Sequence, residues 1–360
     1  MRNCALINLL SEPQLVESWP LKKLELAIRQ AYRCDLLATL AYRLRQVGKL
    51  ESMTNESAKN HFLSMLNVSS SHKKFIAWEV NVLSQLFLQH DKKLILLKGA
   101  AYTISGLPSG DGRLYGDIDL LINKPELKEI ESILRQGLWL PKAMDDYDIN
   151  YYREWSHEIP PVYHATRRSV LDVHHAILPP TCKLKPDSKK ILNNIVPIKG
   201  WPNVYVLSPS DMVLHSMTHL FHEGEFDHGL RDLIDIDALL RFFNEKDECF
   251  YDGLVDRAKE LDLVLPLYYG VRYCNRLLGT PVPEKIFNDL NQYSPKFSKI
   301  IDQLFYRALL PHHKSCDDGF SGISRWLLYV RSHYLRMPVK MLIPHLIRKA
   351  YKERTKDNRQ

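Results

Sequence analysis

The chain has 360 residues, of which 45% are apolar and 25% are charged, and its formal net charge is +7. This composition is typical of a globular protein with one large core or two domains. No uncharged apolar run of about 18 residues occurs, and the N-terminus has no clear basic leader or cleavage site. We therefore expect neither a membrane-spanning helix nor secretion.

The cysteines and the distribution of charge point to the same class of protein. Six cysteines are scattered singly, without the paired spacing of a zinc site or a disulfide framework. Reduced thiols in a cytoplasmic protein are the simplest account. Residues 337–360 carry most of the excess positive charge, so the rest of the chain is close to neutral.

The first 90 residues are predicted to be helical. Apolar residues recur at helical spacing over 20–47, which indicates one or two helices that end near Gly48. The same periodicity predicts separate helices over 55–68 and 73–90.

The pattern changes after residue 90. The apolar run Leu94-Ile95-Leu96-Leu97 predicts a buried strand that ends in a turn at Lys98-Gly99. We expect the following elements to be a short helix over 100–105, a strand over 116–122, a helix over 125–136 and a strand over 169–174.

The last part of the chain is predicted to be helical again. The expected helices lie near 210–222, 229–243, 250–262, 264–278, 296–309 and 323–352. We divide the chain into an N-terminal helical region, a core, a C-terminal helical domain and a basic amphipathic tail. Their expected bounds are 1–90, 91–208, 209–322 and 323–360.

Three carboxylates on the predicted strands carry the chemistry. Side chains at positions i and i+2 of a strand leave the same face, so Asp117 and Asp119 project together. Two like charges at that separation are costly without a cation, and magnesium prefers oxygen ligands. Asp172 lies in an apolar strand and needs a partner. If the two strands are neighbours, three carboxylates converge, enough for two metal ions, with Asp172 as a metal ligand or general base.

Together these motifs resemble a known family. The sequence Leu97-Lys98-Gly99-Ala100, then Arg113, Gly116-Asp117-Ile118-Asp119 and Leu171-Asp172-Val173-His174 is similar to the DNA polymerase beta superfamily of nucleotidyltransferases. More narrowly, it resembles a branch of bacterial uncharacterised nucleotidyltransferases. The similarity covers roughly residues 75–240.

The resemblance implies an α+β fold: a small mixed sheet flanked by N-terminal and C-terminal helical regions. It also implies magnesium on Asp117, Asp119 and Asp172. The triphosphate is expected on the turn at Gly99, with Lys98 and Arg113 supplying positive charge and His174 nearby. Ala100 departs from the family pattern, because the superfamily usually has glycine or serine there. Backbone N–H groups at the start of a helix can still bind phosphate.

Other residues admit a functional and a structural interpretation. Asp211, His215, His219 and His222 form one stripe of a helix, which can line the nucleotide cleft, hold zinc or simply pack. Asp232 is a further candidate for the cleft. Arg231 and Asp235 have the spacing of an ion pair within one helix.

The basic C-terminal segment over 326–360 also has two interpretations. Its apolar and basic residues alternate at helical spacing, which suits peripheral contact with a membrane or another anionic partner. Packing on the body with a solvated tail is the structural interpretation.

The function predicted from the sequence is magnesium-dependent transfer of a nucleoside monophosphate from a nucleoside triphosphate, with ATP expected, to an acceptor hydroxyl. The acceptor can be a small molecule, a protein or an RNA. One alternative is a nucleotide-binding or partner-binding module that has lost catalysis. A metal phosphohydrolase is the second, but it needs a His-Asp doublet where the chain has Asp227-His228.

Overall fold

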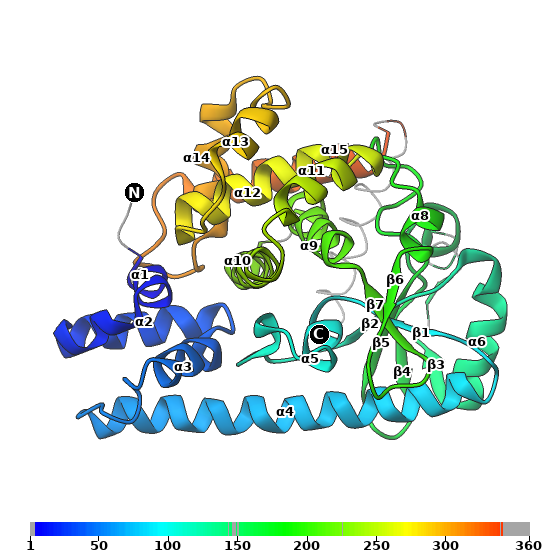
Figure 1. Ribbon diagram of the computed structural model, residues 1–360, viewed down its shortest axis with the longest axis horizontal. Helices are drawn as coiled ribbons and strands as arrows, with labels where there is room; N and C mark the ends of the chain where they lie inside the picture. Colours follow the sequence, from blue (N-terminus) through cyan, green and yellow to red (C-terminus); the bar gives the residue numbers. More distant parts are fainter. Residues whose placement is uncertain are drawn as a thin grey trace, which may run out of the picture.

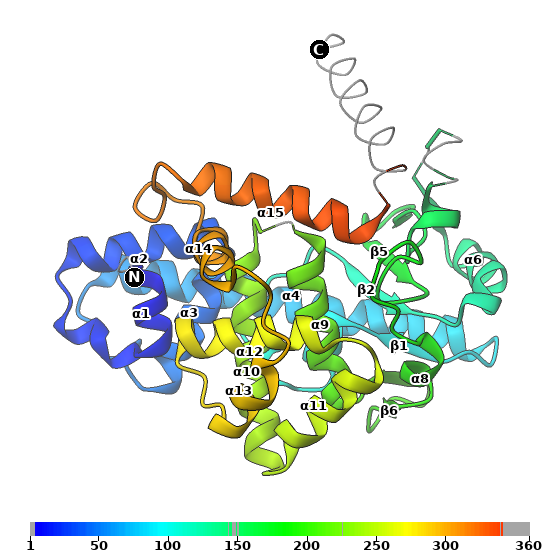
Figure 2. The same ribbon diagram turned by 90° about the horizontal axis from the view of Figure 1, so that it is seen from above.

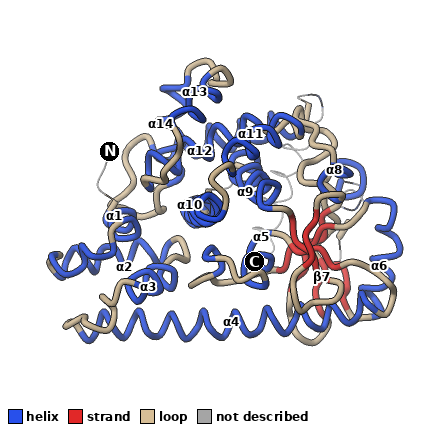
Figure 3. The backbone as a smooth tube through the Cα atoms, in the orientation of Figure 1, coloured by secondary structure: helices blue, strands red, loops and turns tan. Residues whose placement is uncertain are grey.

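The protein is described from a computed structural model that places residues 4–142, 144–145, 149, 151–224, 226–338 and 340. Helices form most of the molecule, and one mixed sheet lies at one end of it (Figure 3). The long helix α4 (Glu56–Leu88) runs from the N-terminal helices to the sheet (Figure 1). The predicted α+β class, a mixed sheet with flanking helices, is confirmed.

The sheet has seven strands in the order β3-β4-β5-β2-β1-β7-β6. Their bounds are β1 Leu94–Leu96, β2 Ile118–Leu121, β3 Trp139–Pro141, β4 Val162–His164, β5 Val170–His174, β6 Ile195–Pro197 and β7 Val204–Leu207. Strand β2 is antiparallel to β1 and parallel to β5, and β1 is parallel to β7. The strands that carry the predicted motifs therefore occupy the centre of the sheet.

The central strands form where the sequence is largely apolar. Every residue of β1 and β2 is buried, including Asp119 within β2. A strand covered on both faces is expected to be a continuous apolar run. Asp119 breaks that rule and so requires buried partners.

The N-terminal part is helical as predicted, but its division into helices differs. The elements are α1 Ala5–Ser11, η1 Pro13–Ser18, α2 Leu21–Arg33, α3 Leu37–Gln46 and α4 Glu56–Leu88. Separate helices over 55–68 and 73–90 were wrong, because α4 continues through the intervening serines. Ser71 donates to the carbonyl of Asn67, and the buried Ser69 donates to the carbonyl of Arg113. These hydroxyls have partners that leave the helical backbone intact.

Two contacts fix α4 and the N-terminal helices against the core. Glu79 is fully buried and bonds Arg167, at 2.8 and 3.0 Å, on the turn between β4 and β5. Gly112 has a φ of +73°, and a Cβ there would lie 2.5 Å from the backbone of Thr39 in α3. Only glycine suits this approach of α3 to the loop that leads into β2.

Shorter helices connect the strands, and larger ones complete the C-terminal part. The connecting elements are α5 Lys98–Ile104, η2 Pro108–Gly110, η3 Lys124–Glu126, α6 Leu127–Gln136, η4 Tyr151–Trp155 and α8 Ser188–Leu192. The C-terminal helices are α9 Pro209–Glu223, α10 Gly229–Lys246, α11 Phe250–Glu260, α12 Val264–Leu278, α13 Glu284–Asn291, α14 Ser298–Leu309 and α15 Ser321–Arg336.

Helix α15 packs on α9 and α14 and lies along one edge of the molecule (Figure 2). The predicted helix over 323–352 is described only as far as Arg336, and residues 341–360 lie outside the described residues. Helix α15 leaves large apolar side chains exposed, among them Trp326 at 59% and Ile323 at 53%. Among the described residues, no helix is both long enough and apolar enough to cross a membrane.

Candidate active site

The register of β2 and β5 brings two of the predicted carboxylates together. The strands are parallel neighbours, and Asp119 is paired with Asp172 across them. Neighbouring strands lie about 4.8 Å apart, so these residues share one local environment. Asp117 precedes β2 and is exposed. These three residues are called the carboxylate site below.

Asp119 lies at the buried end of the carboxylate site. Its Oδ1 atom lies 2.9 Å from Lys98 Nζ and 3.0 Å from His174 Nε2. Burial on its own would raise the pKa of Asp119, but the Lys98 charge and the His174 hydrogen bond outweigh it and hold the pKa well below its usual value. Asp119 is therefore a stable anion that Lys98 and His174 hold in place.

Asp172 shows the opposite behaviour. Burial, followed by the charges of Asp119, Asp117 and Glu158, raises its pKa to about 7. Its Oδ1 atom is buried without a hydrogen-bond partner. The pKa of Asp117 is raised as well, by partial desolvation from the protein around its carboxylate and by the charge of Asp119. Desolvation and the neighbouring carboxylates therefore disfavour ionisation of Asp172 and Asp117, and a bound cation would offset that cost.

The turn after β1 places Lys98 beside Asp119. Lys98 has a φ of +45°, in the left-handed region that non-glycine residues seldom adopt, and it begins α5. Such strain is concentrated at functional sites. Ala100, at 2% exposure, belongs to the buried core.

Gly99 serves a packing role that the sequence did not reveal. A Cβ at this position would lie 2.7 Å from Arg113 Nε and 3.1 Å from Tyr115. Arg113 is almost buried and forms an ion pair with Asp235 of α10. The expected helix-internal pair of Arg231 with Asp235 was therefore wrong, because Arg231 bonds Asp232 instead.

Helix α9 brings two histidines, His215 and His219, towards the site, and α10 brings Asp232. His215 is buried, and its pKa is well below the usual value because of burial and then the charge of Lys98. The Nδ1 atom of His219 lies 4.0 Å from Asp232, whose negative charge Arg231 also balances. Asp211, from the same stripe, belongs to a structural network with Arg257 at 2.7 and 2.9 Å.

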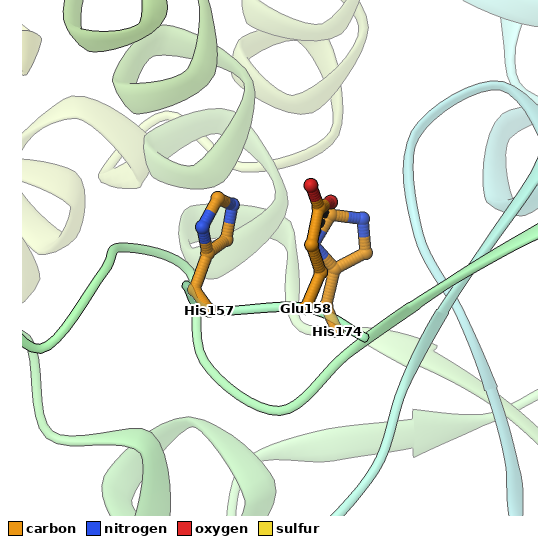
Figure 4. A group of neighbouring side chains, drawn as sticks. All are labelled: His157, Glu158 and His174. Carbon is orange, nitrogen blue, oxygen red and sulfur yellow. Dashed lines mark ion pairs between the residues drawn. The ribbon is translucent and has the colours of Figure 1, made fainter. Parts of the chain in front are cut away.

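Two residues absent from our sequence prediction adjoin the carboxylate site. His157 and Glu158 precede β4, and with His174 they form a group whose potential ligand atoms all lie within 4.8 Å of one another. The three side chains project to the same side of the chain (Figure 4). Two imidazoles and a carboxylate can hold a divalent ion. The dipeptide His157-Glu158 was the sequence signal, but nothing in the sequence placed it beside β5.

Space for a substrate is present beside Asp117. A groove of about 370 Å³ lies between α4 and the edge formed by Tyr115–Ile118 and Ser169-Val170. His72, Phe75 and Ile76 of α4 line its other wall. An exposed carboxylate that borders a largely apolar groove is accessible to both an ion and an organic substrate.

Paired carboxylates on neighbouring strands, with a lysine at the turn after β1, thus form the centre of the candidate site. The chain belongs to the uncharacterised nucleotidyltransferase family, whose model matches residues 21–279. The matched region runs from the start of α2 to the end of α12 and includes the whole sheet. No curated protein and no solved structure matches the chain.

Proposed function

We propose that this protein transfers a nucleoside monophosphate from a nucleoside triphosphate, with ATP the expected nucleotide, to an acceptor hydroxyl in a magnesium-dependent reaction. The observation that carries the proposal is the pairing of Asp119 with Asp172, whose buried Oδ1 atom has no hydrogen-bond partner. Family membership supports nucleotidyl transfer in general.

The residues of the carboxylate site fit magnesium. They offer only carboxylate oxygens, which Mg²⁺ prefers, and the exposed position of Asp117 leaves an approach for substrate phosphates. Asp117, Asp119 and Asp172 would hold the metal, with two ions as the expected number. When bound, magnesium neutralises the triphosphate and stabilises the departing pyrophosphate.

The chain's own residues would act by position and charge. Lys98, at 2.9 Å from Asp119, holds that carboxylate in place and adds positive charge on the side of the proposed nucleotide. Asp172, whose Oδ1 atom has no hydrogen-bond partner, is the proposed acceptor of the proton from the attacking hydroxyl. The acceptor oxygen bonds the α phosphorus, and the bond from that phosphorus to the pyrophosphate oxygen breaks.

The nucleotide is proposed to occupy the region between the β1 turn and helices α9 and α10. The backbone of Gly99 and Ala100 and the side chains of Lys98 and His174 are the proposed contacts. Arg113 is proposed to act through its contact with Gly99, because its own charge is paired with Asp235. His215, His219 and Asp232 are proposed to line the far side, where His219 and Asp232 lie 4.0 Å apart.

Kinship with the DNA polymerase beta superfamily, in a bacterial branch, is part of this proposal. It is supported by the motif from Gly116 to Ile122 and by the parallel β2–β5 pair. A cytoplasmic location is supported by the free state of all six cysteines.

The acceptor is proposed to be a small molecule, a protein side chain or an RNA end.

Peripheral contact of 326–360 with an anionic partner is supported by the exposed apolar residues of α15, such as Trp326. If that contact exists, vesicles of anionic lipid should co-sediment wild-type protein, whereas Trp326→Ser should stay in the supernatant. Equal sedimentation of the two proteins would exclude α15 from the contact.

A binding module without catalysis is the second candidate function. Two observations favour it. Lys98 and His174 already contact the Asp119 carboxylate at hydrogen-bond distance, and Ala100 has no hydroxyl. Release of pyrophosphate separates the candidates, because a module that only binds nucleotide leaves the triphosphate intact.

The test is incubation with labelled ATP, GTP, CTP and UTP in cell lysate with magnesium. Wild-type protein should transfer label to an acceptor, and the Asp117→Asn/Asp119→Asn variant should lose at least about 100-fold of that activity, as removal of charge-stabilising groups usually does. Circular dichroism verifies that the variant is folded. Equal labelling by the two proteins would rule out this assignment.

A further inference from the structure

His157, Glu158 and His174 form a second group of potential ligands next to the carboxylate site. The His157-Glu158 pair lies between η4 and β4, whereas His174 is the last residue of β5. Glu158 Oε2 lies 3.6 Å from His174 Nδ1, and the two imidazole centroids are 5.3 Å apart. Figure 4 shows the carboxylate of Glu158 next to the ring of His174.

Backbone hydrogen bonds hold this group together. The N–H of His175 donates to the carbonyl of His157 at 2.8 Å, and the N–H of Ile159 donates to the carbonyl of Val173 at 3.0 Å. Glu158 and His174 also form an isolated antiparallel bridge. The two segments that carry the ligands are therefore aligned by the fold itself, which lowers the entropic cost of binding an ion.

The contact between His174 and Asp119 sets the orientation of the His174 ring. Since Nε2 lies 3.0 Å from the Asp119 carboxylate, a neutral imidazole that donates its Nε2–H there turns the lone pair of Nδ1 towards Glu158. A carboxylate that accepts from the far nitrogen of a histidine ligand is the usual support of a bound zinc ion.

We propose that His157, Glu158 and His174 bind a divalent transition-metal ion of the zinc class, at a site separate from the magnesium of the carboxylate site. Imidazole nitrogen suits zinc, cobalt and nickel, whereas magnesium takes oxygen ligands. Zinc bonds of about 2.0–2.2 Å need ligand atoms roughly 3–4 Å apart. The potential ligand atoms of the three residues lie within 4.8 Å of one another, and small side-chain rotations would bring them to that separation.

The bound ion has a consequence for the neighbouring carboxylates. It fixes His174 in one tautomer, and His174 then holds Asp119 through the 3.0 Å hydrogen bond. In this respect His174 is a positioning residue for the carboxylate site. This consequence rests on the proposed function, but the metal site itself rests only on the geometry of the three ligands.

The test is metal binding by the full chain after removal of metals. Wild-type protein should retain one equivalent of Zn²⁺ in equilibrium dialysis, and Co²⁺ should give the visible absorption of a site with nitrogen ligands. His157→Asn and Glu158→Gln should each weaken Co²⁺ binding by more than about tenfold. His61→Asn, which changes an exposed histidine of α4, is the matched control and should bind as wild type does.

A second variant separates this proposal from the transferase proposal. Asp117→Asn should lose magnesium-dependent transfer but keep the Co²⁺ spectrum of wild type. Retention of that spectrum by His157→Asn and Glu158→Gln, or failure of wild-type protein to retain any Zn²⁺, would overturn the metal site. Thermal melts of each variant without metal show whether a loss of binding reflects a loss of folding.

Discussion

The ionised Asp172 carboxylate should destabilise the metal-free protein, so Asp172→Asn should raise its melting temperature at pH 8. Asn keeps the size of the side chain and removes the charge that faces Asp119 and Asp117. The pKa of Asp172 is raised from 3.8 to about 7 by burial and by those charges. Because the folded pKa lies above the unfolded one, folding favours the protonated form.

The size of the effect follows from that shift. A separation of about 3 units, at about 1.4 kcal/mol for each unit, gives an upper limit of about 4 kcal/mol at pH 8. Asp172 retains some contact with solvent, so we halve this figure to about 2 kcal/mol. With an unfolding entropy of about 2 cal/mol/K for each of the 360 residues, the melting temperature should rise by about 3 °C.

The pH dependence of the melting temperature tests the direction of the Asp172→Asn effect a second time. The stabilisation from the neutral carboxyl is fully present below about pH 4 and is lost as the pH rises through about 7. The advantage of Asp172→Asn should therefore be largest at pH 8, about a third as large at pH 5 and absent near pH 4.

Scanning calorimetry in EDTA and then in magnesium provides the assay. Magnesium should raise the melting temperature of wild-type protein and have a smaller effect on Asp172→Asn, because one ligand is gone. Asp256→Asn, at a side chain 79% exposed, is the matched control and should change little. A lower melting temperature for Asp172→Asn than for wild type at pH 8 would refute the reasoning, since the carboxylate would then be stabilising.

Two further predictions concern the support of the site. Gly99→Ala should cost about 1–3 kcal/mol of unfolding free energy and reduce nucleotide binding, because the new Cβ displaces Arg113. Chemical denaturation measures the first effect and nucleotide titration the second. Wild-type values in both assays would contradict the packing role of Gly99. Glu79→Gln should cost about 3–5 kcal/mol in urea denaturation, because it leaves Arg167 without its buried partner, whereas Glu25→Gln at an exposed pair should cost less than about 1 kcal/mol. Equal costs for the two glutamate variants would contradict the buried role of Glu79.

The sequence predicted the central strands well because they carry strong local signals. Residues 94–97 form an apolar run, and the segment 169–174 contains Val170, Leu171 and Val173; β1 and β5 form there. Strands β3, β4, β6 and β7 were not predicted. Strands β3 and β6 each have three residues and end in proline. Pairing with β4 and β7, which local pattern does not encode, makes them strands.

The sequence named the carboxylates of the candidate site, whereas their contacts depend on the tertiary structure. The spacing of Asp117 and Asp119 is visible in the sequence, although Asp117 precedes β2. The pairing of Asp119 with Asp172 depends on the tertiary structure. The same holds for Arg113 with Asp235, where the helical spacing of Arg231 with Asp235 misled the prediction. The periodicity of apolar residues indicates which residues belong to one helix or strand. It does not indicate which helices and strands pack against each other.

The central claim is attack on the α phosphorus of a nucleoside triphosphate. The most direct measurement compares ATP labelled on its α phosphorus with ATP labelled on its γ phosphorus, each incubated with protein, magnesium and lysate. We predict that the α label joins the acceptor while the γ label appears in pyrophosphate. Transfer of the γ label to the acceptor, or its release as inorganic phosphate with the α label left in ADP, would contradict nucleotidyl transfer.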